Sequence, residues 1–214
     1  MFLVADGMGG QDQGELASRL AADIIPEAIQ DALQANKEPI EAVRYGIDLA
    51  HQTILRTSKG QLSSRRMGTT AVLAICLGDE VYVSGVGDSP AYLVRQGKVE
   101  QLTIDHTVAD ALSRSGTLTE EQARQSPWRN VLYRFLGCAE MQDSAEVRAY
   151  RPQPGDRLIL ASDGLSGHVF PEDLRDGGKG FANMQEWADH LVQLALDRGS
   201  RDNVTVVVVA FEAA

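Results

Sequence analysis

The sequence predicts an α+β fold in which helices cover antiparallel sheets. Short β-rich runs in the middle of the chain are joined by Gly/Asp turns, which is typical of hairpins. Stretches with helical spacing of apolar residues stand before and after them. No repeat or linker interrupts the 214 residues, of which 43% are hydrophobic. We therefore expect residues 1–214 to form a single domain with one packed interior.

The first elements are a strand and two helices. Residues 2–5 form an apolar strand that runs into a glycine-rich turn, and since termini usually lie at the surface, we expect further residues upstream of it. Pro26 is expected to kink or split the first helix, and Pro39 suits the first turn of the second. The apolar stripes of the two helices are Leu16, Leu20, Ile24, Ala28 and Leu33, then Ile40, Val43, Ile47, Ala50 and Ile54.

Strands and short helices alternate in the remainder. The expected strands are residues 69–77, 80–86, 91–95, 99–102, 130–136, 145–151, 157–161 and 203–211. The continuous valine run of the last strand indicates burial on both faces. Residues 106–127 read as helical with a break at Ser115–Gly116 and a restart at Thr119, whereas 170–180 hold at most a short helix. A final helix, from Met184 to about Ala195, is ended by Gly199.

The charge and the apolar runs exclude several classes of partner. A net charge of −10 makes a nucleic-acid or anionic-lipid partner unfavourable. The longest apolar run, residues 204–211, is far shorter than the ~20 residues that a membrane helix needs. The first residues do not resemble a signal peptide, and two cysteines make no disulfide framework. We therefore expect a monomeric cytoplasmic protein.

Aspartates recur where apolar strands meet turn residues. The clearest cases are Asp6, Asp163 and Asp202, and looser cases are Asp88 and Asp105. One such aspartate is usually a turn former that bonds its own backbone. Three or more on core strands can instead converge, and converged carboxylates repel one another unless a cation neutralises them.

The type of cation follows from the available ligands. Carboxylate oxygens suit Mg²⁺ or Mn²⁺, and Ca²⁺ less well. Zinc fits badly because the four histidines, at positions 51, 106, 168 and 190, share no ligand spacing, although His106 is placed to face the site. The sequence contains no Gly-x-Ser-x-Gly elbow and no phosphate-binding loop of the Gly-x4-Gly-Lys-Ser/Thr type.

Eight short motifs, in order along nearly the whole chain, resemble those of the metal-dependent serine/threonine protein phosphatases of type 2C in their bacterial form. They are residues 4–10 (VADGMGG), 14–18 (GELAS), 68–71 (GTTA), 86–89 (VGDS), 105–107 (DHT), 129–132 (RNVL), 162–165 (SDGL) and 199–205 (GSRDNVT). Each motif is weak alone, but together they are highly specific.

The resemblance implies an α-β-β-α sandwich, two antiparallel sheets flanked by helices, with a metal site at one end. Asp6 would bridge two core Mn²⁺ or Mg²⁺ ions, with the Gly7 carbonyl as a further ligand. Asp163 and Asp202 would complete the shell of the first ion. Asp105 resembles the ligand of a third ion, which would share Asp163.

The resemblance also implies a reaction. A hydroxide held by the two ions would attack the phosphorus of phosphoserine or phosphothreonine in proteins, with Asp6, Asp163 and Asp202 as the catalytic residues. The substrates would be phosphoproteins made by an opposing serine/threonine kinase. Residues 114–130 resemble the flap of bacterial members.

One departure from the family leaves alternatives open. Family members carry a strand pair before the Asp6 motif, with a phosphate-contacting Arg and an acidic pair, and this chain begins after it. The natural start would then lie upstream, or the chain is a short form that is weak or inactive and binds phosphoproteins. A Ca²⁺-stabilised structural domain is a third hypothesis. The retained aspartates favour catalysis.

Overall fold

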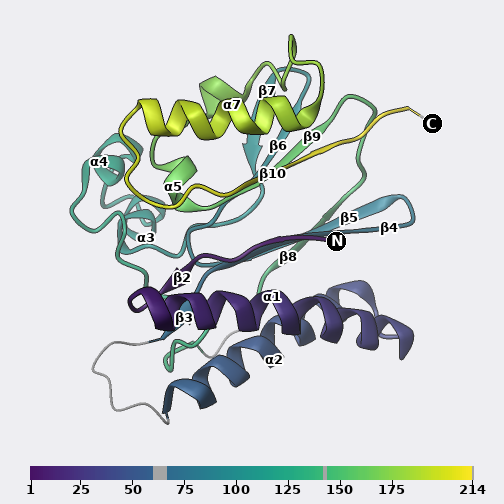
Figure 1. Ribbon diagram of the computed structural model, residues 1–214, viewed down its shortest axis with the longest axis vertical. Coiled ribbons are helices and arrows are strands. Elements are labelled where there is room, and N and C mark those ends of the chain that lie inside the picture. Colours follow the sequence, from purple (N-terminus) through teal and green to yellow (C-terminus); the bar gives the residue numbers. More distant parts are fainter. Residues whose placement is uncertain (60–66, 142–143, 214) are drawn as a thin grey trace.

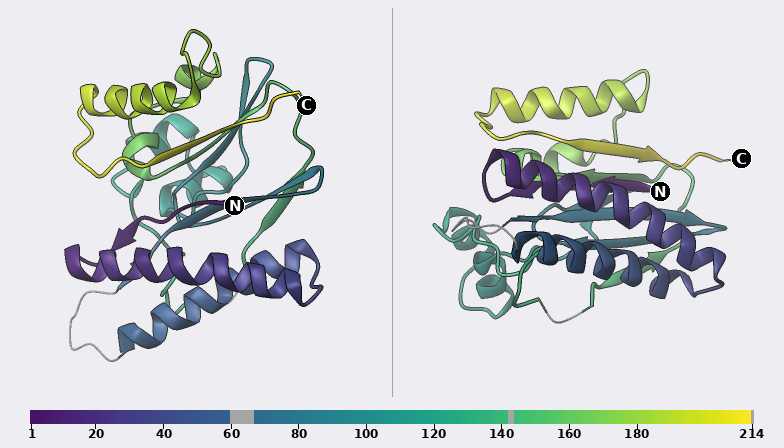
Figure 2. Two further views of the ribbon diagram at one scale, coloured as in Figure 1. Left: turned by 45° about the vertical axis from the view of Figure 1, so that its right-hand side comes forward. Right: turned by 60° about the horizontal axis from the view of Figure 1, so that its bottom comes forward.

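Two four-stranded antiparallel sheets lie face to face between helices in the computed structural model (Figure 1). The structure describes residues 1–59, 67–141 and 144–213. Helices α1 (Gln11–Gln34) and α2 (Pro39–Lys59) cover the outer face of one sheet, and α7 (Met184–Asp197) covers the other (Figure 2). The predicted α-β-β-α sandwich is confirmed.

The first sheet contains the β4–β5 hairpin and has the order β1-β4-β5-β8. Its strands are β1 (Phe2–Val4), β4 (Ala71–Leu77), β5 (Glu80–Val86) and β8 (Val147–Tyr150). The predicted strand 69–77 divides at Thr70, because β3 (Gly68–Thr69) pairs with β2 (Gly7–Met8) instead. This small ladder places the turn that follows Asp6 against the start of β4.

The second sheet has the order β10-β9-β6-β7. Its strands are β10 (Val206–Ala210), β9 (Arg157–Ala161), β6 (Ala91–Arg95) and β7 (Lys98–Gln101). β9 is central, with Leu158 to Ala161 fully buried. The valine run packs against an apolar layer on each face, as predicted, with Val207 and Val209 on one and Val206 and Val208 on the other. Its residues are only half-buried, because β10 is an edge strand that pairs with β9 alone.

Three apolar layers hold the sandwich together. The first packs α1 and α2 on the first sheet, the second fills the space between the sheets, and the third packs α7 on the second sheet. Residues fully buried in these layers include Ile25, Ile47, Leu73, Leu158, Leu160 and Leu191. Among the described residues, no helix is both long and apolar enough to cross a membrane.

Helix α1 differs from its prediction in two respects. It runs through Pro26 without a break, because the carbonyl that loses its amide partner belongs to Ala22, which is exposed to water. Its buried face also consists mainly of small residues and is offset from the predicted stripe, leaving Leu16 36% exposed. Small side chains let α1 lie close to α2 and to β2.

The segment after β7 confirms the predicted helices but not the predicted strand. Helices α3 (Val108–Arg114) and α4 (Glu120–Gln125) flank the predicted break, and the Thr119 side chain caps α4. Residues 130–136 form only isolated bridges, Thr107 with Leu132 and Thr69 with Leu136. Their apolar character reflects Phe135 and Leu136, which are buried in the interior without joining a sheet. Two further one-turn helices are α5 (Asp163–Ser166) and α6 (Pro171–Leu174).

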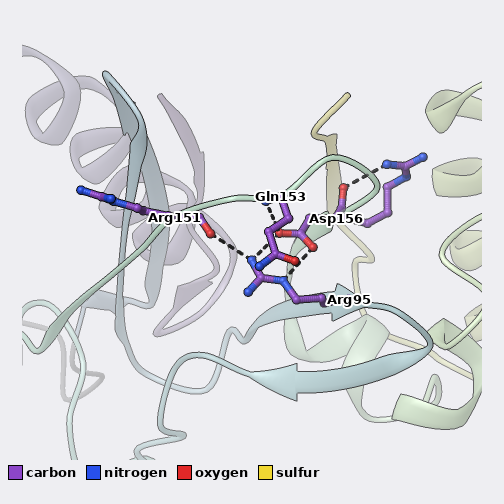
Figure 3. A network of polar contacts seen from close by, with 5 residues as sticks. Arg95, Arg151, Gln153 and Asp156 are labelled. Atoms are coloured by element: carbon purple, nitrogen blue, oxygen red, sulfur yellow. Dashed lines mark hydrogen bonds and ion pairs between the residues drawn. The ribbon is translucent and has the colours of Figure 1, made fainter. Parts of the chain in front are cut away.

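A buried ion pair joins the two sheets at the β8–β9 connection (Figure 3). Asp156, 1% exposed, accepts hydrogen bonds from Arg95 Nε at 2.9 Å and from the Gln153 amide at 2.8 Å. The same guanidinium donates to the Arg151 carbonyl at 3.0 Å. Since Arg95 ends β6 and Arg151 follows β8, the network fixes how the chain crosses from one sheet to the other.

Replacing the buried carboxylate should therefore destabilise the fold. We expect Asp156→Ala to lower the free energy of unfolding in urea by about 2–4 kcal/mol, because the Gln153 amide and the Arg95 guanidinium, whose side chain is 31% exposed, lose a buried acceptor. Glu100→Ala is the matched control, since the Glu100–Arg148 pair is about half exposed and should contribute about 0–1 kcal/mol. Equal losses in the two variants would contradict this assignment.

Candidate active site

Four aspartates lie where strands of the two sheets end or begin at the same end of the sandwich. Asp6 follows β1, Asp88 follows β5, Asp163 follows β9 and opens α5, and Asp202 precedes β10. Figure 1 shows β2, α5 and the start of β10 together at this end, away from the labelled C-terminus. Strands from two stacked sheets thus bring these carboxylates together.

Asp6 and Asp163 form the centre of this cluster. Burial, followed by the charges of Asp163 and Asp202, raises the pKa of Asp6 to about 7. Burial and the charge of Asp202 also raise the pKa of Asp163. The charge of Asp163, at the end of one sheet, thus acts on Asp6 at the end of the other. The structure therefore brings all three predicted catalytic aspartates within electrostatic reach of one another.

Asp88 is a further member of the cluster that the sequence marked only as a looser case. Burial raises its pKa to about 7, and the charges of Asp163 and Asp202 act in the same direction. The sequence indicated a site role for Asp88 only by its position directly after a strand. A Gly-Asp pair in a region rich in hairpins is also typical of an ordinary turn. Only the packing of the two sheets brings Asp88 within electrostatic reach of Asp163.

Asp105 lies at the margin of the cluster, beside Asp88. Burial raises its pKa to about 7, with Asp88 and Asp110 as the contributing charges, and the Gln101 amide donates to it at 2.7 Å. Its neighbour His106 is buried and neutral, since burial lowers its pKa to about 4. His106 and Ile104 line a cavity of about 250 Å³ together with Arg114, Tyr133, Arg134 and Met141.

Gly7 is held in place by helix α1. Its carbonyl lies against Gly14, and a Cβ built on Gly7 would stand only 2.0 Å from the Gly14 carbonyl oxygen. Only glycine allows β2 to approach α1 this closely. The backbone that carries the predicted Gly7 ligand is thus fixed by packing with the helix.

A second anchor joins Asp163 to Asp202. The buried Ser162 hydroxyl accepts the Thr205 amide at 3.0 Å and donates to the Asn203 carbonyl at 3.2 Å. The Ser162 amide donates to the Thr205 carbonyl at 3.0 Å. The β9–α5 junction and the loop before β10 are therefore bound to each other directly beside the two carboxylates.

The donor set at this end fits a hard divalent cation. It consists of carboxylate oxygens on rigid backbone. Burial first, and the charges of the neighbouring carboxylates second, raise the pKa values of Asp6, Asp88 and Asp163, and a cation would neutralise that gathered charge. In the ranges that the structure describes, no three His, Cys, Asp or Glu side chains stand in a ready-made metal cluster.

Comparisons with known proteins show the family of this chain. The family model described as protein phosphatase 2C matches residues 1–204. The serine/threonine phosphatase stp of Listeria welshimeri is 34% identical over 213 residues, which is 98% of this chain and 83% of that protein. The crystal structure of the Mycobacterium tuberculosis serine/threonine phosphatase PstP/Ppp superposes with a TM-score of 0.86 at 31% identity, covering 99% of this chain and 88% of that one.

One solved relative is described with metal. The catalytic domain of PstP in complex with two manganese ions is 31% identical, with a TM-score of 0.77 over 96% of this chain and 85% of that one. The family model and the relatives above 30% identity cover nearly the whole chain, and the range that the family model matches includes every aspartate of the carboxylate cluster. The chain therefore belongs to the protein phosphatase 2C family and groups with its bacterial serine/threonine phosphatases.

Proposed function

We propose that this phosphatase hydrolyses phosphoserine and phosphothreonine in proteins with the help of divalent cations held by Asp6, Asp163 and Asp202. The observation that supports the proposal is the carboxylate cluster at the common end of the two sheets, where burial and like charges raise the pKa of Asp6 and Asp163. Cations bound at such a site supply charge neutralisation for a phosphoryl group and activation of water.

Each residue has a distinct part in this proposal. Asp6, at the centre, would contact two core Mn²⁺ or Mg²⁺ ions, and the relative described with two manganese ions supports that number. Asp163 and Asp202, joined through Ser162, would hold one of them from the second sheet. The Gly7 carbonyl would add a neutral oxygen.

The outer carboxylates would form a weaker third position. Asp105 remains our proposed ligand there, and Asp88, whose charge acts on Asp105, would be a further ligand of the same position. The charge of Asp163 acts on Asp88 in turn, so Asp88 would join the third position to the core pair.

The substrates would be phosphoproteins supplied by a serine/threonine kinase, since only such an enzyme forms the ester that this site would cleave. Residues 114–130, which include α4, would form a flap beside the site. Helix α4 buries none of its residues, so this helix presents its side chains to solvent and to an approaching protein.

Loss of one core carboxylate should abolish the reaction. We expect Asp163→Asn to lower Mn²⁺-dependent phosphate release from a phosphothreonine peptide by more than about 100-fold, because direct ligands matter more than the residues behind them. The circular dichroism spectrum should be unchanged. The matched control is Asp189→Asn, the same substitution on the exposed face of α7, which should retain wild-type turnover. Full activity in Asp163→Asn would refute the assignment.

Removing cations should also change stability. At a Mn²⁺ concentration 100-fold above its Kd, we expect about 2.7 kcal/mol of stabilisation over the EDTA-treated protein. This corresponds to a rise in Tm of about 5–10 °C. Asp6→Asn should lose this rise, while its Tm in EDTA stays at or above the wild-type value, because one repelling charge is gone.

Differential scanning calorimetry with Mn²⁺, Mg²⁺ and Ca²⁺ provides the comparison. Stabilisation by Ca²⁺ alone, without phosphate release in any cation, would instead favour a structural cation site. A metal-free Asp6→Asn protein that melts well below the wild type would show that Asp6 stabilises the fold and does not strain it.

A further inference from the structure

One buried hydroxyl lies between the loops that carry Asp6 and Asp88. We infer that Thr70 is a positioning residue that sets the separation of these two carboxylates and thereby the affinity of the site for cations. The inference rests on the proposed function, because it concerns the same carboxylates. Thr70 itself would touch neither substrate nor cation.

Thr70 is bonded to Asp6 in both directions. The Asp6 amide donates to Thr70 Oγ1 at 3.0 Å, and the Thr70 amide donates to the Asp6 carbonyl at 2.8 Å. The neighbouring Thr69 hydroxyl donates to the same carbonyl at 2.8 Å. The backbone of Asp6 is therefore fixed on both sides by Thr69 and Thr70, at the junction of β3 and β4, 63 and 64 positions away in sequence.

The same Thr70 oxygen reaches the second loop. It lies 2.6 Å from the Ser89 hydroxyl, and both residues are buried, at 2% and 3% exposure. A threonine hydroxyl has one proton and two lone pairs, so it can accept from the Asp6 amide and still bond to Ser89. Ser89 directly follows Asp88, so the contact ties Thr70 to the loop of that carboxylate. Because the contact is buried, water is poorly placed to replace it.

Packing reinforces this link. Gly87 has φ +104°, and a Cβ on it would stand 2.6 Å from the Thr70 methyl carbon. The Gly87 amide donates to His106 Nδ1 at 3.0 Å, and the His106 amide donates to the Gly87 carbonyl at 2.9 Å. One continuous set of buried contacts thus runs from Asp6 through Thr70 to the loops of Asp88 and Asp105.

The consequence is specific to cation binding. Carboxylates that repel one another move apart unless the backbone holds them, and ligand groups held at the right spacing bind a cation more tightly. Removing the Thr70 hydroxyl should therefore weaken cation binding beyond any general loss of stability. Residues that orient metal ligands typically change affinity or activity about 10- to 100-fold when they are mutated.

Thr70→Val tests the inference, because it keeps the side-chain shape and removes the hydroxyl. Mn²⁺ affinity is measured by titration calorimetry at a temperature where every variant is folded, and half-saturating Mn²⁺ is measured in phosphate release from a phosphothreonine peptide. We expect both constants to rise at least about 10-fold. Thr70→Ser, which retains the hydroxyl, should restore them to within about threefold of wild type.

Ser84→Ala is the matched control. The buried Ser84 hydroxyl lies in β5 of the same sheet and donates to the Glu146 carbonyl at 2.6 Å, a bond that leads to none of these aspartates. This variant should lose stability in urea without a change in Mn²⁺ affinity. A merely structural role for Thr70 would make Thr70→Val behave in the same way.

Ser89→Ala keeps the test decisive if Thr70→Val fails to fold. It removes only the contact toward Asp88, and we expect it to weaken Mn²⁺ binding by about threefold to tenfold, within the lower range of such effects. Unchanged Mn²⁺ affinity in the folded Thr70→Val protein, or in Ser89→Ala if that protein alone folds, would overturn the inference while leaving the proposed function intact. A wild-type chain that binds no Mn²⁺ would overturn both.

Discussion

Repulsion among the carboxylates at one end of the sandwich is the constraint on which the rest of the structure depends. Burial raises the pKa of Asp6 and Asp88 to about 7, and each carboxylate makes ionisation of the others harder. Burial and the charge of Asp202 raise the pKa of Asp163 in the same way. A fold that keeps such groups together must supply rigidity elsewhere.

That rigidity comes from the strands and from short polar contacts behind them. The central strand β9 is buried almost throughout and carries Asp163 at its end. Buried hydroxyls of Thr70, Ser89 and Ser162 then bond one strand end to the next. These hydroxyls are uncharged, so they position the carboxylates without adding charge to the cluster. The Arg95–Asp156 network makes the corresponding connection at the β8–β9 crossing.

Much of this arrangement could be predicted from local patterns. Helical spacing correctly placed α2 and α7, and Gly-Asp turns correctly placed the β4–β5 hairpin. The prediction for residues 130–136 was wrong because alternating apolar residues look the same whether they enter a sheet or anchor a loop, as Leu136 does. Half-burial of Val206 to Ala210 was missed because the position of a strand within its sheet depends on distant partners.

By itself the sequence determined the α+β class, the order of most elements and three aspartates at strand ends. These are local properties, set by the spacing of apolar residues and by turn formers over a few positions. Only the tertiary structure decided that Asp88 lies within electrostatic reach of Asp163 and of Asp105, and that Thr70 connects the loops of Asp6 and Asp88. The physical reason is that burial, carboxylate repulsion and the buried hydroxyl bonds depend on distances between residues far apart in the chain, and the packing of the two sheets sets those distances.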